Sequence, residues 1–263
     1  MWGEYLYGTI PTYRTFVFAA AVVGTLVVVF AARRVKLSAG RIVLFELGLA
    51  TAAIVGAKLW GVIEEGSFDR LQWVNFFGGF RYPGALVGLL LATPLLCRTL
   101  FPGLSVAALA DLVAPSIGFA ETVGRMGCFL SGCCFGDVCD LPWAIRFPRD
   151  SPAYRFQGLQ GLLSGNPASS LPVHPLQLYF AALGLALGIF LLWFQRRKSY
   201  DGQVILLFVA VHEWGKFGLE FLRAPIAPEG RLYLQLASLT LALLASAVLL
   251  ARAPLRRRLA AAT

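Results

Sequence analysis

Charged residues are scarce in this chain of 263 residues: Asp, Glu, Lys and Arg make up 14% of it, and 58% is hydrophobic. A soluble globular domain has about 25% charged and about 45–50% apolar residues. So few charges cannot cover a water-soluble surface, and so high a hydrophobicity is not found in disordered chains. The composition therefore excludes a soluble enzyme and a disordered protein.

The first residues, Met1–Tyr7, contain no positive charge and thus lack the n-region of a secretory signal. The first apolar run is therefore expected to remain as a membrane span. Paired CxxC motifs are also missing, although Cys128, Cys133, Cys134 and Cys139 lie close together in the pattern C-x4-C-C-x4-C.

The apolar residues fall into seven runs of about 17–22 residues, each long enough to cross a hydrocarbon core of about 30 Å. The predicted spans are Tyr13–Ala32, Ile42–Ile63, Gly84–Phe101, Leu104–Gly124, Pro175–Phe194, Gly202–Leu222 and Leu232–Ala251. Arginine-rich ends follow the first, third, fifth and seventh spans, and such ends lie in the cytoplasm. The sequence predicts an all-α polytopic membrane protein, a single domain over residues 1–263, with its N-terminus external and its C-terminus cytoplasmic.

The net charge of +9 does not predict a nucleic-acid partner, because the basic residues gather at the ends of the apolar runs. Two external segments separate the spans. The segment 64–83 is rich in aromatic residues, which favours a place at headgroup level. The segment of about residues 125–174 is predicted to form a small external head between spans four and five.

Several charges lie inside predicted spans, where each costs about 2.5–3.5 kcal/mol unless it faces a partner or a cavity. Glu213, Lys216, Glu220 and Arg223 are spaced by three, four and three residues, so they share one helical face that is expected to point inward. Two interpretations remain open: a structural ladder of ion pairs, or a polar site for a headgroup or an ion. Other ionisable residues predicted at bilayer depth are Glu46, Lys58, Asp111, Glu121 and His212.

The most informative stretch is GRMGCFLSGCCFG, residues 124–136. Its glycines allow a tight backbone and the close approach of a ligand. Arg125 is predicted at headgroup depth, where a guanidinium binds phosphate bidentately or simply snorkels to the interface. The cysteines are compatible with disulfides, with a reactive thiolate or with small packing residues; their spacing does not match a structural zinc site, and no metal or other cofactor is predicted.

These motifs resemble the prolipoprotein diacylglyceryl transferase family. In its signature, G-R-x-G-N-F-x-N-x-E-x-x-G, the matching residues are Gly124, Arg125, Gly127, Phe129 and Gly136. A histidine–proline–glutamine–leucine–tyrosine segment of the family is matched by His174, Pro175, Gln177, Leu178 and Tyr179. Lys216, Glu220 and Arg223 resemble its basic–acidic–basic helix, with lysine where arginine is expected, and Tyr13 corresponds to an early tyrosine.

The resemblance has departures at positions that matter for chemistry. Cys128 and Ser131 stand in place of the two asparagines of the signature, and Cys133 stands in place of its glutamate. Tyr82 stands where the family has the histidine of a His-Gly-Gly segment, so the family's proposed base is absent there.

The resemblance implies a monomeric bacterial inner-membrane enzyme that transfers a diacylglyceryl group from phosphatidylglycerol to the lipobox cysteine in the signal peptide of a prolipoprotein. Under this hypothesis the catalytic candidates are Arg125, Arg223, Lys216, Glu220, His174 and Tyr82. The substrate-binding candidates are Tyr13, Gly124, Gly127, Cys128, Ser131, Cys133, Gly136, Gln177 and Tyr179. Three alternatives remain open: a phospholipid-dependent transferase with another acceptor, a non-catalytic lipid-binding relative, and a membrane thiol–disulfide enzyme.

Overall fold

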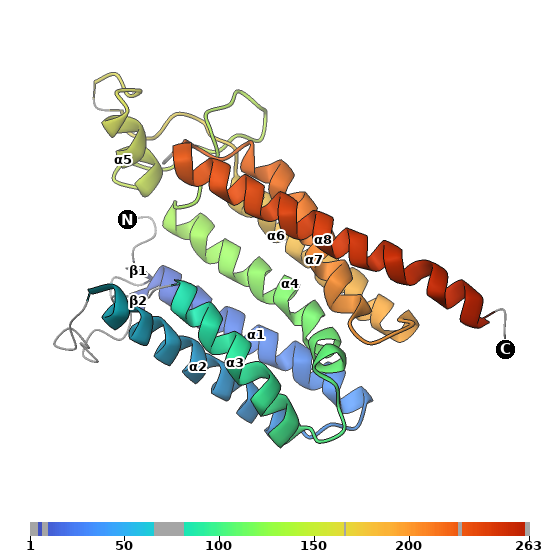
Figure 1. Cartoon of the computed structure of the whole chain (residues 1–263). Coiled ribbons are helices and arrows are strands. Elements are labelled where there is room, and N and C mark those ends of the chain that lie inside the picture. Colours follow the sequence, from blue (N-terminus) through green and yellow to red (C-terminus); the bar gives the residue numbers. More distant parts are fainter. Residues whose placement is uncertain (1–4, 7–9, 66–81, 166, 226–227, 261–263) are drawn as a thin grey trace. The chain divides into compact units, whose positions relative to one another are not determined.

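The computed structural model of the chain describes residues 5–6, 10–65, 82–165, 167–225 and 228–260. A small hairpin pairs β1 (Tyr5–Leu6) antiparallel with β2 (Ile10–Pro11), and helices make up the other described elements. The helices are α1 (Thr12–Arg34), α2 (Ala39–Glu65), α3 (Tyr82–Leu100), α4 (Val106–Ser131), α5 (Pro152–Leu159), α6 (Leu176–Phe194), α7 (Gln203–Glu220) and α8 (Pro228–Ala260), as Figure 1 shows.

Each of the seven predicted spans corresponds to a helix. In the described part of the chain, six helices are long and apolar enough to cross a membrane, and these are α1, α2, α3, α4, α6 and α8. The other, α7, is apolar at its start but carries Glu213, Lys216 and Glu220 toward its end. Exposed side chains such as Phe18 and Leu91 suit contact with lipid. The chain is an all-helical polytopic membrane protein.

The end of α4 differs from the prediction, because the helix continues past Gly124 to Ser131. Residues 125–131, assigned to the head from their glycines and cysteines, are therefore helical. The reason lies in packing: a Cβ on Gly127 would lie 2.5 Å from the Cβ of Phe16 in α1, so the glycine allows the two helices to approach closely.

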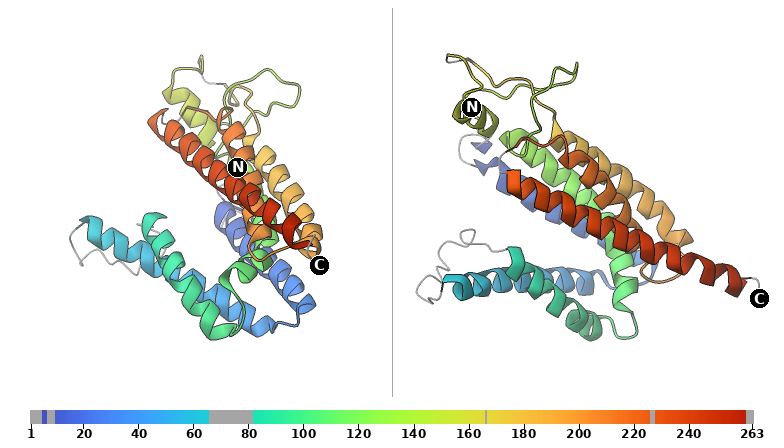
Figure 2. Two further views of the ribbon diagram at one scale, coloured as in Figure 1. Left: turned by 45° about the vertical axis from the view of Figure 1, so that its right-hand side comes forward. Right: turned by 45° about the horizontal axis from the view of Figure 1, so that its top comes forward.

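The chain divides into two compact units, one formed by residues 1–27 and 113–263 and the other by residues 28–112. In the second unit, α2 and α3 lie side by side (Figure 2). A Cβ on Gly56 would lie 2.2 Å from the carbonyl oxygen of Gly84, and one on Gly88 would lie 2.2 Å from that of Ala52. Small residues four apart on both helices thus let the two backbones touch.

In the first unit, α4 and α6 meet in the same way. A Cβ on Gly118 would lie 2.4 Å from the carbonyl oxygen of Gly184, and the Thr122 hydroxyl donates to the Ala181 carbonyl at 3.1 Å. α6 also contacts α7, which packs along α8. A buried cluster on α4, α6 and α7 contains Ala114, Leu187, Leu191, Val204 and Phe208.

The head between α4 and α6 has a small apolar cluster of Phe135, Phe147, Ala153, Val173 and Ala224. It includes α5, which the sequence did not predict. Ser151 caps this helix by accepting a hydrogen bond from the Tyr154 N–H, and Pro152 is its first residue. A β-bridge between Gly136 and Arg223 ties the head to the end of α7.

Candidate active site

Two arginines from distant parts of the sequence meet at one aromatic ring. Arg125 lies near the end of α4, and Arg223 follows the end of α7. The guanidinium carbon of Arg125 is 4.2 Å from the centre of the Phe180 ring, and that of Arg223 is 5.9 Å from it. Phe180 is buried in α6, so its face is a fixed platform for both cations.

Each of these arginines is held by its own carboxylate. Arg125 donates from Nε and Nη2 to Oε1 of Glu121 at 3.3 and 3.1 Å. Arg223 donates to both carboxylate oxygens of Glu220, at 2.6 and 2.8 Å, and Glu220 is 1% exposed. A guanidinium has five N–H donors, so each arginine keeps donors beyond those that its carboxylate engages. The pair is thus oriented to bind an anion.

A chain of polar contacts runs from Arg125 across to α7. Oε2 of Glu121 lies 2.8 Å from Nε2 of His212, and Nδ1 of His212 lies 3.0 Å from Oε1 of Glu213. Lys216 forms an ion pair with Glu213 at 3.5 Å. The four charges predicted on one face of this region are therefore paired as Glu213 with Lys216 and Glu220 with Arg223, and their side chains are mostly buried, as expected.

Three cysteines meet where α4 ends. The helix closes with hydrogen bonds from Gly132 N–H to the Phe129 carbonyl and from Cys133 N–H to the Cys128 carbonyl, both 3.1 Å. These two hydrogen bonds require a residue in the left-handed conformation at the helix end, and Gly132 supplies it with φ +67°. Cys134 is also left-handed, with φ +56°, so the chain turns back over the helix end.

As a result, the Sγ atoms of Cys128, Cys133 and Cys134 lie within 4.8 Å of one another. All five cysteines are free thiols, so the disulfide interpretation finds no support in this structure. Hydrogen bonds with the Cys128 and Cys133 thiols, helped by the charge of Arg223, hold the pKa of the Cys134 thiol below its ordinary value although burial opposes this. The cluster therefore adjoins the arginine pair.

A sequence model of prolipoprotein diacylglyceryl transferase matches residues 5–254, almost the whole chain. The chain belongs to the prolipoprotein diacylglyceryl transferase family.

Named relatives of this family member are moderately similar to it. The phosphatidylglycerol–prolipoprotein diacylglyceryl transferase of Clostridium tetani is 32% identical over 173 residues, which are 65% of this chain and 63% of that protein. Transferase 2 of Clostridium perfringens is 33% identical over 176 residues, 65% of this chain and 62% of that protein. The enzyme of Vibrio vulnificus strain CMCP6 is 36% identical over 154 residues, 58% and 49% of the two chains. The matched region thus spans less than two thirds of each relative's length.

The glycines of the family signature have different surroundings in this chain: two are tightly packed and one faces open space. Gly127 packs on Phe16, and a Cβ on Gly136 would lie 2.5 Å from the Cβ of His174, so both glycines allow close packing. A Cβ on Gly124 would meet nothing within 4 Å, which leaves space beside Arg125. The Ser131 hydroxyl is buried and has no hydrogen-bond partner among the described residues.

The second family segment lies at the start of α6. Nδ1 of His174 is 3.4 Å from the Tyr179 hydroxyl, which accepts a hydrogen bond from the Trp143 indole at 2.7 Å. Gln177 is fully buried and donates to the Cys133 carbonyl at 2.6 Å. Through Gln177, this segment therefore supports the backbone of the thiol cluster.

The remaining sequence candidates lie on α1, α2 and α3. Tyr13, on the first turn of α1, is 51% exposed and lies close enough to Arg125 and to the three clustered cysteines for their charges to act on its hydroxyl. Glu46 and Lys58 lie on α2, in the other unit. Tyr82 begins α3 in that unit, and its side chain lies outside the described part of the chain, as do residues 66–81 of the aromatic segment.

Three features of the site were not foreseen by the sequence analysis. Phe180 gave no signal, because an aromatic residue in an apolar span looks like any core residue. Glu121 and His212 were singled out as charges in spans, but their pairing joins α4 to α7 and is not readable from spacing along one helix. Cys134 was noted only as part of the cysteine pattern.

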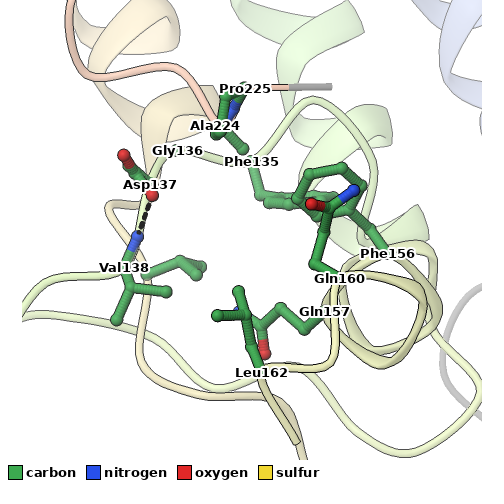
Figure 3. A pocket seen from close by; sticks show the side chains of 11 residues that line it. Phe135, Gly136, Asp137, Val138, Phe156, Gln157, Gln160, Leu162, Ala224 and Pro225 are labelled. Atoms are coloured by element: carbon green, nitrogen blue, oxygen red, sulfur yellow. Dashed lines mark hydrogen bonds between the residues drawn. The ribbon is translucent and has the colours of Figure 1, made fainter. Parts of the chain in front are cut away.

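A separate pocket of about 270 Å³ lies in the head (Figure 3). Phe135, Val138, Phe156, Leu162 and Val173 give it apolar walls, and its one ionisable lining residue is Asp137. The Asp137 carboxylate accepts a hydrogen bond from the Val138 N–H at 2.8 Å. The described lining of this pocket contains no cationic side chain.

Proposed function

We propose that this chain transfers a diacylglyceryl group from phosphatidylglycerol to the lipobox cysteine thiol of a prolipoprotein and releases glycerol phosphate. The observation that carries this proposal is the pair Arg125 and Arg223 at the Phe180 ring, each oriented by a carboxylate. Membership of the family and the names of the relatives agree with it.

The reaction needs a thiolate that attacks the glycerol carbon bearing the phosphate ester. The S–C bond forms, the C–O bond breaks, and its electron pair stays on glycerol phosphate, which gains negative charge. Fixed cations at that charge stabilise the transition state. Arg125 and Arg223 take this role, and Glu220 positions Arg223 without touching the substrate.

The other predicted residues support the site, line its walls or are candidates for the base. Lys216 neutralises Glu213 and so supports the polar chain behind Arg125. His174 and Tyr82 remain the candidates for a protein base that accepts the thiol proton. Tyr13, Gly124, Ser131, Gln177 and Tyr179 are assigned to the walls of the substrate site, together with the signature glycines and cysteines.

The proposed setting is the cytoplasmic (inner) membrane of a bacterium, with the N-terminus and the head outside. Phosphatidylglycerol enters sideways from the lipid, and the signal peptide of the prolipoprotein approaches from the head. We propose that the enzyme acts as a monomer and as one membrane domain.

A second candidate, a transferase that uses the same donor with another acceptor, is favoured by one observation. Cys128, Ser131 and Cys133 replace polar signature residues, so the acceptor side of the site is chemically changed. The donor side, with both arginines, is retained.

The test uses purified protein, headgroup-labelled phosphatidylglycerol and a lipobox peptide. We expect peptide-dependent release of glycerol phosphate and a gain of one diacylglyceryl mass on the peptide. Release without a change in the peptide would indicate another acceptor. Absence of both products from folded protein would contradict the proposal and favour a lipid-binding or redox role.

A further inference from the structure

The thiol cluster borders Arg223, which interacts with Cys134, and it is the densest group of soft ligands in the described chain. Cys128 is 8% exposed, and Cys133 and Cys134 are half-buried, so all three are sheltered but can be reached. Three thiols gathered in this way are compatible with an ordinary packing cluster, a disulfide pair or a metal site.

The geometry favours metal. Sulfur ligands at about 2.3 Å from Zn²⁺ lie about 3.8 Å apart in a tetrahedron. The three Sγ atoms lie within 4.8 Å of one another, so small side-chain rotations bring them to that spacing.

The backbone around these thiols is held both by the end of α4 and by Gln177 of α6, as expected for metal ligands whose relative positions must stay fixed. The helix-closing bonds fix Cys128 relative to Cys133, and the buried Gln177 amide holds the Cys133 carbonyl at 2.6 Å. Cys134 is kept in the left-handed conformation, which is unfavourable for a non-glycine residue. The Oε1 atom of Gln177 is buried and has no donor among the described residues.

We infer that Cys128, Cys133 and Cys134 bind one Zn²⁺ ion and leave its fourth position open to the thiol of the acceptor. Three protein ligands with an open position are typical of catalytic rather than structural zinc. Soft thiolate ligands select zinc over the hard cations of a membrane surface.

The role of this ion rests on the proposed function. A thiol that coordinates zinc loses its proton, which passes to solvent. The bound thiolate sulfur then forms the bond to the glycerol carbon, and glycerol phosphate leaves toward Arg125 and Arg223. Zinc would thus supply the acceptor thiolate in place of a base such as His174 or Tyr82, while the described His212 is engaged by two carboxylates.

The first experiment measures zinc in the full-length protein, purified in detergent without chelator. We expect about one zinc ion per chain, and less than about 0.1 in Cys128→Ser, Cys133→Ser and Cys134→Ser. Cys97→Ser and Cys139→Ser are matched controls, because these thiols lie outside the cluster, and both should keep the metal. Wild-type protein without zinc, or with a disulfide among the three cysteines, would overturn the inference.

A second experiment on the wild-type protein does not depend on the folding of any variant. Replacing zinc by Co²⁺ gives sulfur-to-metal charge-transfer bands whose intensity follows the number of thiolates. A lipobox peptide should increase that intensity by about one third, and the same peptide with serine for cysteine should not. No cobalt bands would overturn the zinc site, and bands unchanged by the cysteine peptide would overturn the open position.

These readouts separate the two proposals. Arg125→Ala should keep its zinc while it loses transfer. Zinc bound without transfer to the peptide would leave the metal site standing and contradict the proposed function. Transfer that persists after complete removal of zinc would leave the proposed function standing and contradict the role of zinc in it.

Discussion

Glu121 and His212 are joined across the first unit, with Oε2 of the carboxylate 2.8 Å from Nε2 of the imidazole. The same carboxylate accepts hydrogen bonds from Arg125 through its other oxygen. The position of Arg125 therefore depends on His212 of α7, which lies 91 positions after Glu121 in the sequence. The buried charged residues of α4 and α7 therefore also orient Arg125 in the site.

Replacement of His212 by leucine should destabilise the protein, because it leaves Glu121 and Glu213 without the donor between them. Removing one partner of a buried polar pair costs about 1–3 kcal/mol. The measurement is the melting temperature in detergent. The matched control is Val211→Ala, whose side chain is exposed, and equal melting temperatures for the two variants would contradict this role of His212.

Arg125→Ala and Arg223→Ala should each lower transfer from phosphatidylglycerol by at least about 100-fold, as for loss of a fixed donor at developing charge. Arg→Lys at either position should recover little, because an ammonium group cannot donate in a planar fork. Arg155→Ala, on an exposed face of α5, is the control for general effects of charge. Near-normal turnover in either alanine variant, shown to be folded, would exclude the phosphate assignment.

Much of this arrangement was predictable from the sequence. The apolar runs predicted every long helix, since a membrane span must satisfy its own backbone hydrogen bonds and leaves few choices. Charges inside the runs predicted an inward polar face, and Glu220 with Arg223 and Glu213 with Lys216 confirm it. Arg125 was singled out by its predicted headgroup depth and Arg223 by its helical spacing, and the resemblance made both catalytic candidates. Their shared ring is what the structure adds.

The missed features depend on contacts between distant segments. The residues after Gly124 were assigned to the external head, but residues 125–131 continue α4, where Gly127 packs against Phe16. The pattern C-x4-C-C-x4-C does not match the paired CxxC spacing of a structural zinc site, so the sequence predicted no metal. Left-handed Gly132 and Cys134 fold that spacing into a compact cluster, and no rule of periodicity foresees this.

Two glycines of α4 should respond in opposite ways to alanine. In Gly118→Ala the new Cβ would lie 2.4 Å from the Gly184 carbonyl oxygen, so α4 and α6 must separate and the melting temperature should fall. In Gly124→Ala the Cβ meets nothing within 4 Å, and the lower backbone entropy of alanine should leave stability equal or higher by about 0.5–1 kcal/mol.

Activity then tests the ligand role of Gly124. If the open space beside Arg125 receives the donor, Gly124→Ala should raise the KM for phosphatidylglycerol several-fold while the protein stays as stable as the wild type. An unchanged KM would show that the donor does not approach this glycine.

Gln157→Leu should loosen the head without affecting the helices. Gln157 is 1% exposed, and its Oε1 accepts a hydrogen bond of 2.7 Å from the Leu171 N–H, which no apolar side chain can replace. Leaving that buried donor unpaired costs about 1–3 kcal/mol. Hydrogen exchange should therefore quicken in residues 132–174 and stay unchanged in α6. Gln160→Leu is the control, because its side chain is exposed on the same helical segment. If both variants exchange alike, the hydrogen bond of Gln157 does not hold the head together.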